Sequence, residues 1–210
     1  MLHVVMKLPS HFYGMVDAAF GHEPVALAAT MLDAGARILQ LRLKDLPARD
    51  FLAAARTIAS LCRERGAVLI VNDRVDIAML ANAHGVHLGQ EDLPLDAARR
   101  VAGAGIIIGI STHTIEQAHA AEDGGADYIG FGPMYPGGLK SIRAGQGLEN
   151  LRAVRAAVKI PIVAIGGITE ATVPEILAAG ADAAAIITDV LASPDISAKV
   201  RSILALAGQR

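Results

Sequence analysis

Eight short apolar runs recur along the chain, and several of them end in polar residues. The runs occupy positions 11–17, 37–44, 67–73, 85–89, 106–111, 128–133, 161–166 and 183–188. They are apolar throughout instead of alternating, which is typical of parallel strands that helices cover on the outside. Polar residues confined to the carboxyl end of such a strand are typical of a barrel that delivers side chains to an active site.

Alanine-rich segments with helical periodicity separate the runs, for example the stripe that includes Leu52 and Ile58. Three of these segments end at a glycine just before the next run, at Gly35, Gly125 and Gly180, and we expect these glycines to adopt the left-handed cap. Eight strand-then-helix units in 210 residues favour a closed barrel over an open sheet. A dinucleotide-binding sheet would require a glycine-rich loop after the first run, and the sequence has none there. The sequence therefore predicts one α/β domain over residues 1–210, a closed (β/α)8 TIM barrel.

Composition narrows the class of protein. Apolar residues make up 53% of the chain and aromatic residues 3%, so we expect an aliphatic, alanine-rich core. The net charge of -2 gives no basic field for nucleic acid. A single cysteine, Cys62, excludes an internal disulfide, and we expect it to be buried in a helix. No apolar run reaches the roughly 20 residues of a membrane span, and no signal peptide is evident. We expect a cytoplasmic protein without membrane or nucleic-acid partners; a homo-oligomer stays open.

The second run carries the strongest chemical signal. Its side chains alternate, so Gln40, Arg42 and Lys44 share one face while Leu41 and Leu43 share the other. The leucines can pack under helices, and the three polar side chains then point into the barrel near its mouth. Two cations buried there are costly unless an anion pairs with them. That anion is either a carboxylate of a neighbouring strand or a phosphorylated substrate.

Two carboxylates follow the third and fourth runs, Asp73 and Asp92. Adjacent strands lie under about 5 Å apart, so these side chains can converge at the mouth. Oxygen ligands without Cys or His favour a hard cation, most simply a partly hydrated Mg²⁺ that bridges to phosphates. Two alternatives need no metal: Asp73 caps the next helix, or Asp73 or Glu91 pairs with the cations. The cation pair Arg42 and Lys44 opposite the carboxylate pair suits Mg²⁺-diphosphate binding better than stability alone.

The later runs add weaker signals. Ser111 can donate a hydrogen bond to a ligand or cap the following helix. We expect His87 to be packed and hydrogen-bonded, and His113 to lie at the surface or behind the site. The sequence contains no convincing set of nucleophile, base and orienting residue.

A second anion site is expected where the seventh and eighth runs end, at Gly166-Gly167 and at Ile187-Thr188. Backbone amides in these two loops form the common phosphate cradle of such barrels. The longest glycine-rich loop, 136–147, follows the sixth run and is expected to be a mobile active-site loop.

The stretches 40–44, 69–94, 108–114, 125–136 and 162–168 resemble the thiamine phosphate synthase family, also called thiamine-phosphate pyrophosphorylase. The most specific part is Asn72-Asp73 together with 85–92. The resemblance implies a closed barrel in which pyrophosphate leaves a hydroxymethylpyrimidine diphosphate. The nitrogen of a thiazole phosphate then captures the resonance-stabilised cation and gives thiamine phosphate. Such a step needs leaving-group stabilisation and positioning more than proton transfer.

The resemblance also implies a role for individual residues. The catalytic residues would be Arg42, Lys44 and Lys140. Asp73 and Asp92 would bind Mg²⁺. The substrates would be bound by Gln40, Leu41, Arg42, Leu43, Lys44, Asn72, Ser111, Gly137, Leu139, Lys140, Gly167, Ile187 and Thr188.

One departure from the family pattern concerns the loop after the sixth run. Gly137 and Leu139 stand where the family usually has two threonines before the lysine, here Lys140. Two lost hydrogen bonds to a charged ligand would cost about 3–6 kcal/mol, at about 1.5–3 each. We hypothesise that Ser141 or Arg143 compensates.

Three other functions stay open. A thiazole tautomerase of the same superfamily would need no diphosphate site, and a non-catalytic sensor would bind a phosphorylated metabolite without turnover. A different phosphate-handling barrel, epimerase-like or aldolase-like, would use Lys44 as the first candidate for a Schiff base.

Overall fold

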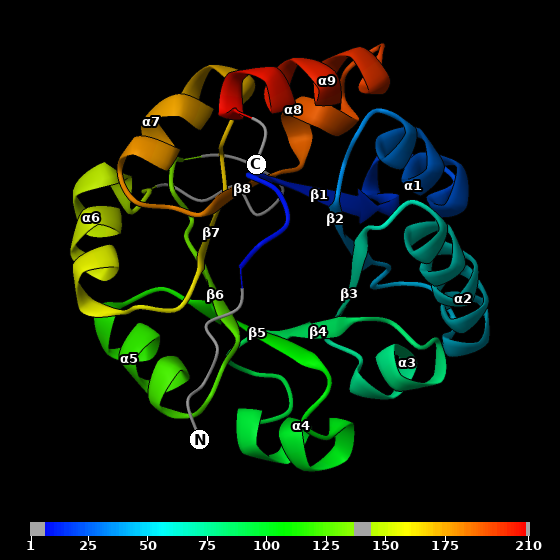
Figure 1. The fold of residues 1–210 in the computed structure, drawn as a ribbon, viewed down its shortest axis with the longest axis horizontal. Helices are drawn as coiled ribbons and strands as arrows, with labels where there is room; N and C mark the ends of the chain where they lie inside the picture. The colour runs from blue at the N-terminus through cyan, green and yellow to red at the C-terminus, as the bar shows by residue number, and fades with distance from the viewer. Residues whose placement is uncertain (1–6, 137–143, 209–210) are drawn as a thin grey trace.

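The computed structural model describes residues 7–136 and 144–208. Its centre is a closed barrel of eight parallel strands in chain order, with β8 paired back onto β1 (Figure 1). The strands are β1 (Phe12–Asp17), β2 (Ile38–Arg42), β3 (Val68–Asn72), β4 (Gly85–Leu88), β5 (Ile107–Thr112), β6 (Tyr128–Phe131), β7 (Ile162–Ile165) and β8 (Ala183–Ile186). All eight predicted runs overlap these strands, and the predicted TIM barrel is confirmed.

Helices form a ring around the barrel (Figure 1). They are α1 (Pro24–Asp33), α2 (Ala48–Glu64), α3 (Val75–Leu80), α4 (Leu95–Ala102), α5 (Ile115–Asp123), α6 (Gly147–Ala157), α7 (Val173–Ala178), α8 (Thr188–Leu191) and α9 (Ile196–Ala207). Two 3-10 turns add η1 (Ala18–Phe20) and η2 (Glu170–Thr172). Among the helices of the described ranges, none is long and apolar enough to cross a membrane.

The core has two layers. The outer layer lies between strands and helices and contains Leu41, Leu43 and Cys62. Cys62 is fully buried on α2, as expected, and burial raises the pKa of its thiol to about 12. The inner layer fills the barrel with side chains such as Tyr13 and Tyr128. This arrangement follows from strand alternation, since neighbouring side chains point to opposite faces.

The turns from helix to strand are built as the glycines indicated. Gly35, Gly125 and Gly180 have φ values of +110°, +84° and +107°, a region that side chains with a Cβ rarely adopt. The eighth run is shorter than predicted. The backbone leaves the extended conformation at Ile187, with φ -106° and ψ -78°, so Thr188 begins the short helix α8 instead of ending β8.

Candidate active site

Both cations of the second run pair with carboxylates at the mouth of the barrel. Arg42 Nη1 lies 2.5 Å from Asp17 Oδ2, and Lys44 Nζ lies 3.6 Å from Asp73 Oδ2. The pairing of a cation with Asp73 was the alternative to a phosphorylated ligand, and the structure shows it for Lys44, but Asp17 was missed. A polar residue at the carboxyl end of an apolar run was the signal used for the other strands, and Asp17 has it as the last residue of β1. The side chain of Asp17 is only 4% exposed, so Arg42 neutralises a buried charge, whereas Lys44 is half exposed and free to reorient.

Asp73 and Asp92 interact with each other at the ends of neighbouring strands. Burial and the nearby Asp92 raise the pKa of Asp73, while Lys44 opposes this shift. Asp92 Oδ2 accepts a 2.6 Å hydrogen bond from the Gly89 amide, which fixes its orientation. The capping alternative for Asp73 is wrong, because α3 has Arg74 at its N-cap and no side-chain cap hydrogen bond.

The carboxylate pair fits the expected cation. Two half-buried carboxylates destabilise each other unless positive charge lies between or beside them. Within the described ranges no cluster of three or more His, Cys, Asp or Glu side chains could hold a metal. A site with two protein carboxylates is what Mg²⁺ uses when water and phosphate oxygens complete its coordination. Asp73 and Asp92 are therefore suited to Mg²⁺ bound together with a diphosphate.

A chain of hydrogen bonds crosses the barrel beneath these charges. Gln40 Nε2 donates to the Tyr13 hydroxyl at 3.0 Å, and the hydroxyls of Tyr13 and Tyr128 lie 2.8 Å apart. His87 follows, with Nδ1 3.0 Å from the Tyr128 hydroxyl and Nε2 2.9 Å from Ser111 Oγ. The packed, hydrogen-bonded role expected for His87 is confirmed, and burial lowers its pKa to about 4. The two tyrosines were missed, because nothing local distinguishes them from other core residues.

The remaining polar candidates differ in their hydrogen bonds and in their exposure. Ser111 does not cap α5, whose N-cap is Thr114 with its hydroxyl accepting from the Gln117 amide. His113 is exposed, and its Nδ1 lies 2.6 Å from the Gly132 carbonyl oxygen, which agrees with a surface role. Asn72 ends β3 and is half-buried at the mouth.

The leucines of the second run face away from this group. The side chains of Leu41 and Leu43 lie in the outer layer under the helices, as strand alternation required. Their side chains are buried away from the mouth, so a substrate contact of these residues remains a prediction for the main chain alone.

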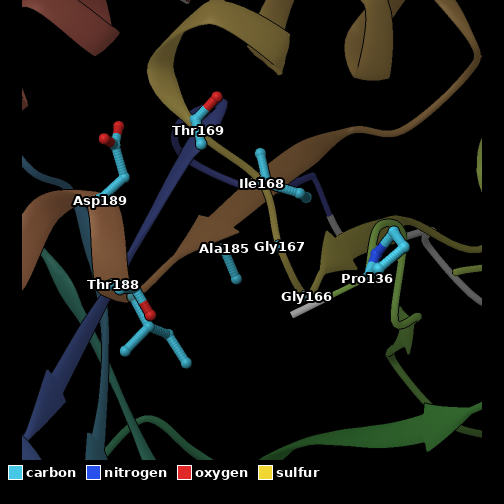
Figure 2. Close-up of a pocket in the computed structure, with 9 residues that line it drawn as sticks. Pro136, Gly166, Gly167, Ile168, Thr169, Ala185, Thr188 and Asp189 are labelled. Carbon is cyan, nitrogen blue, oxygen red and sulfur yellow. The ribbon is translucent and has the colours of Figure 1, made fainter. Parts of the chain in front are cut away.

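A separate cavity of about 290 Å³ opens beside the ends of β7 and β8 (Figure 2). Its lining consists of Pro136, Gly166, Gly167, Ile168, Thr169, Ala185, Ile187, Thr188 and Asp189. The predicted residues Gly167, Ile187 and Thr188 are thus brought together, while Thr169, Ala185 and Asp189 were missed. Figure 2 shows the glycine pair between Thr188 on one side and Pro136 on the other.

The glycine pair is sterically required in this cavity. Gly166 and Gly167 have φ values of +98° and +68°. A Cβ on Gly166 would lie 2.7 Å from Pro133 Cα, and one on Gly167 would lie 2.8 Å from the Tyr135 carbonyl oxygen. At these two positions the cavity is therefore lined by bare backbone, which is the kind of surface that binds a phosphate through amides. The candidates Gly137, Leu139, Lys140, Ser141 and Arg143 lie outside the described residues.

Comparison with known proteins identifies one family. A family model described as thiamine monophosphate synthase matches residues 12–190. A thiamine-phosphate synthase of Methanospirillum hungatei is 50% identical over 184 residues, which cover 86% of this chain and 88% of the relative. One of Methanocella arvoryzae is 48% identical over 185 residues, or 87% of each chain.

A solved structure gives the same result. The thiamine phosphate pyrophosphorylase from Pyrococcus furiosus superposes with a TM-score of 0.88 at 35% identity, covering 95% of this chain and 96% of that one. The resemblance seen in the sequence is confirmed over most of the chain. The chain therefore belongs to the thiamine-phosphate synthase family, transferases that release pyrophosphate.

Proposed function

We propose that this chain condenses a hydroxymethylpyrimidine diphosphate with a thiazole phosphate, with Mg²⁺, and forms thiamine phosphate and pyrophosphate. The observation that carries the proposal is the charged group at one end of the barrel, in which Arg42 pairs with Asp17 and Lys44 pairs with Asp73. Lys44 Nζ lies 3.6 Å from Asp73 Oδ2, so positive and negative groups alternate where a metal-bound diphosphate would bind.

The diphosphate is the centre of the proposed chemistry. Asp73 and Asp92 would hold Mg²⁺, which, when bound, supplies positive charge to the leaving diphosphate. Arg42 would contact the same group and is oriented for this by its ion pair with Asp17. Lys44, half exposed and only loosely paired at 3.6 Å, would turn from Asp73 to a phosphate oxygen. Cations placed in advance where charge develops lower the barrier most effectively.

The pyrimidine would bind deeper in the mouth. Gln40, Asn72 and Ser111 would hold its ring, and the main chain at Leu41 and Leu43 would border it. Lys140 would reach the departing diphosphate from the loop after β6. None of these residues needs to act as a general base, because the nitrogen of the thiazole attacks with its own lone pair. Positioning the two reacting atoms within a near-attack distance is then the main task of the protein.

The thiazole phosphate would occupy the cavity beside β7 and β8. Gly167, Ile187 and Thr188 would contact its phosphate group, partly through backbone amides, and Gly137 and Leu139 would border it from the loop. The cavity of about 290 Å³ is large enough for a small phosphorylated ring. Two anion-binding sites at one barrel mouth would suit an enzyme that joins two phosphorylated molecules better than a sensor of one.

The test is turnover with both substrates. Purified protein with Mg²⁺ is expected to form thiamine phosphate and pyrophosphate in equal amounts, and a chelator should stop both. Asp92→Ala should abolish turnover while the barrel stays folded, and Asp96→Ala is the matched control because Asp96 is an exposed residue of α4. Diphosphate binding without product would instead support a sensor or a diverged enzyme, in which Gly137 and Leu139 no longer allow the second substrate.

A further inference from the structure

The hydrogen-bonded chain inside the barrel links two proposed substrate contacts. It starts at Gln40 on β2 and ends at Ser111 on β5. Between them stand Tyr13, Tyr128 and His87, which come from β1, β6 and β4. Both tyrosines are about 1% exposed, so their hydroxyl groups have lost contact with water and depend on one another.

Two glycines reserve the space that this chain occupies. A Cβ on Gly109 would lie 2.1 Å from Cζ of Tyr128, closer than any non-bonded contact allows. A Cβ on Gly130 would lie 3.0 Å from Cε1 of His87. Both glycines have ordinary backbone angles, since neither is among the residues of the described ranges with positive φ. Their role is therefore to leave room for the two rings. The barrel is thus shaped to accommodate this hydrogen-bond chain.

With Gln40 Nε2 as the donor to Tyr13, every donor of this hydrogen-bond chain finds an acceptor only if the hydrogens run from Tyr13 towards Ser111. Tyr13 accepts a hydrogen bond from Gln40 Nε2, and its own buried hydrogen is satisfied when it is donated to the Tyr128 hydroxyl. Tyr128 in turn must donate to Nδ1 of His87, which is then the unprotonated ring nitrogen. In this direction Nε2 of His87 carries the hydrogen and donates it to Ser111 Oγ, which lies 2.9 Å away. Burial lowers the pKa of His87 to about 4, so the ring stays neutral and Nδ1 stays an acceptor near neutral pH.

We propose that Tyr13, Tyr128 and His87 are positioning residues that make the Ser111 hydroxyl a hydrogen-bond donor to the substrate. Since Ser111 Oγ already accepts from His87, its own hydrogen is the part that points to the ligand. An acceptor atom of the substrate, a ring nitrogen or a phosphate oxygen, can use this hydrogen, whereas a substrate with an N–H at that position leaves the hydrogen without a partner and binds more weakly. This inference rests on the proposed function for the identity of the substrate.

The direction in which the hydrogen bonds run from Gln40 to Ser111 can be measured without substrate. Nitrogen-15 NMR of protein labelled at its seven histidines distinguishes a protonated from an unprotonated ring nitrogen, and His87→Gln assigns the signal. We expect Nε2 to carry the hydrogen, and Tyr128→Phe to give a mixture of both tautomers. A wild-type ring protonated at Nδ1 would reverse the chain, make Ser111 donate to His87, and overturn the proposal.

Kinetics with the two substrates test the consequence for Ser111. Ser111→Ala and Tyr128→Phe should each raise KM for the pyrimidine diphosphate about tenfold, the equivalent of one hydrogen bond, and leave KM for the thiazole phosphate unchanged. The double variant should be no worse than Ser111→Ala alone, because both changes remove the same interaction. Multiplied effects in the double variant would mean that Tyr128 is only structural.

A conservative change and a matched control complete the experiment. His87→Gln keeps an N–H donor near Ser111 and should recover most of the affinity that His87→Leu loses. His119→Gln makes the same change at an exposed histidine of α5 and should behave as wild type. If the wild type forms no thiamine phosphate, the proposed function fails, and the NMR measurement still decides the direction of the chain.

Discussion

Gly109→Ala is the change whose consequence the structure specifies most sharply. The new Cβ would lie 2.1 Å from Cζ, 2.4 Å from Cε1 and 2.5 Å from the hydroxyl oxygen of Tyr128. Ordinary contact needs about 3.5 Å or more, so the ring must shift by more than about 1 Å. The ring cannot shift and keep its 2.8 Å and 3.0 Å hydrogen bonds to Tyr13 and His87.

The cost of this shift has two parts. Overpacking a core typically costs about 1–3 kcal/mol, and each lost hydrogen bond about 0.5–1.5 kcal/mol. We therefore expect Gly109→Ala to lower the free energy of unfolding by about 2–6 kcal/mol. Tyr128→Phe removes the two hydrogen bonds without adding volume, so it should account for about 1–3 kcal/mol of this loss.

Urea denaturation followed by circular dichroism measures the free energy of unfolding. Gly105→Ala is the matched control, because a Cβ there meets nothing within 4 Å and the backbone has no positive φ, so its change should stay within about 0.5 kcal/mol. Thermal melting should agree, with Tm of Gly109→Ala lower by at least about 4 °C. Equal stability of the two alanine variants would refute the argument that Gly109 makes room for the Tyr128 ring.

Three further changes test other parts of the site. Asp92→Asn should abolish Mg²⁺-dependent turnover without lowering the denaturation midpoint of the metal-free protein, because it removes a charge that raises the pKa of Asp73; a clearly lower midpoint would contradict this. The free energy of unfolding should fall by up to about 3 kcal/mol from pH 6.5 to pH 4. The reason is that the pKa of His87 is lowered to about 4 in the fold, so the unfolded chain takes up a proton on this ring more readily than the folded one. His87→Gln should flatten this dependence in a pH series of urea titrations, and an unchanged slope would count against it. Gly167→Ala should raise KM for the thiazole phosphate about tenfold or more, because φ is +68° and the Cβ would press on the Tyr135 carbonyl; an unchanged KM would separate this cavity from that substrate.

Local pattern was sufficient to predict the barrel. Apolar runs with polar carboxyl ends, alternating with alanine-rich helical stripes, define eight strand–helix units, and closure follows from that repetition. The same pattern indicated that Arg42, Lys44, Asp73 and Asp92 meet at the mouth, because the carboxyl ends of parallel strands lie at one end of a barrel. These predictions depend only on residue type and spacing, which are local properties of each segment of the sequence.

The pairing of these groups was decided by the tertiary structure. Arg42 pairs with Asp17 because the two residues stand opposite each other in the ladder between β1 and β2, a register that no local pattern reveals. Likewise, the chain from Gln40 to Ser111 joins side chains of five strands, up to 115 residues apart between successive members. The sequence by itself determined which residues share one face of a strand, whereas closure of the barrel decided which side chains touch, because a hydrogen bond requires two atoms within about 3 Å.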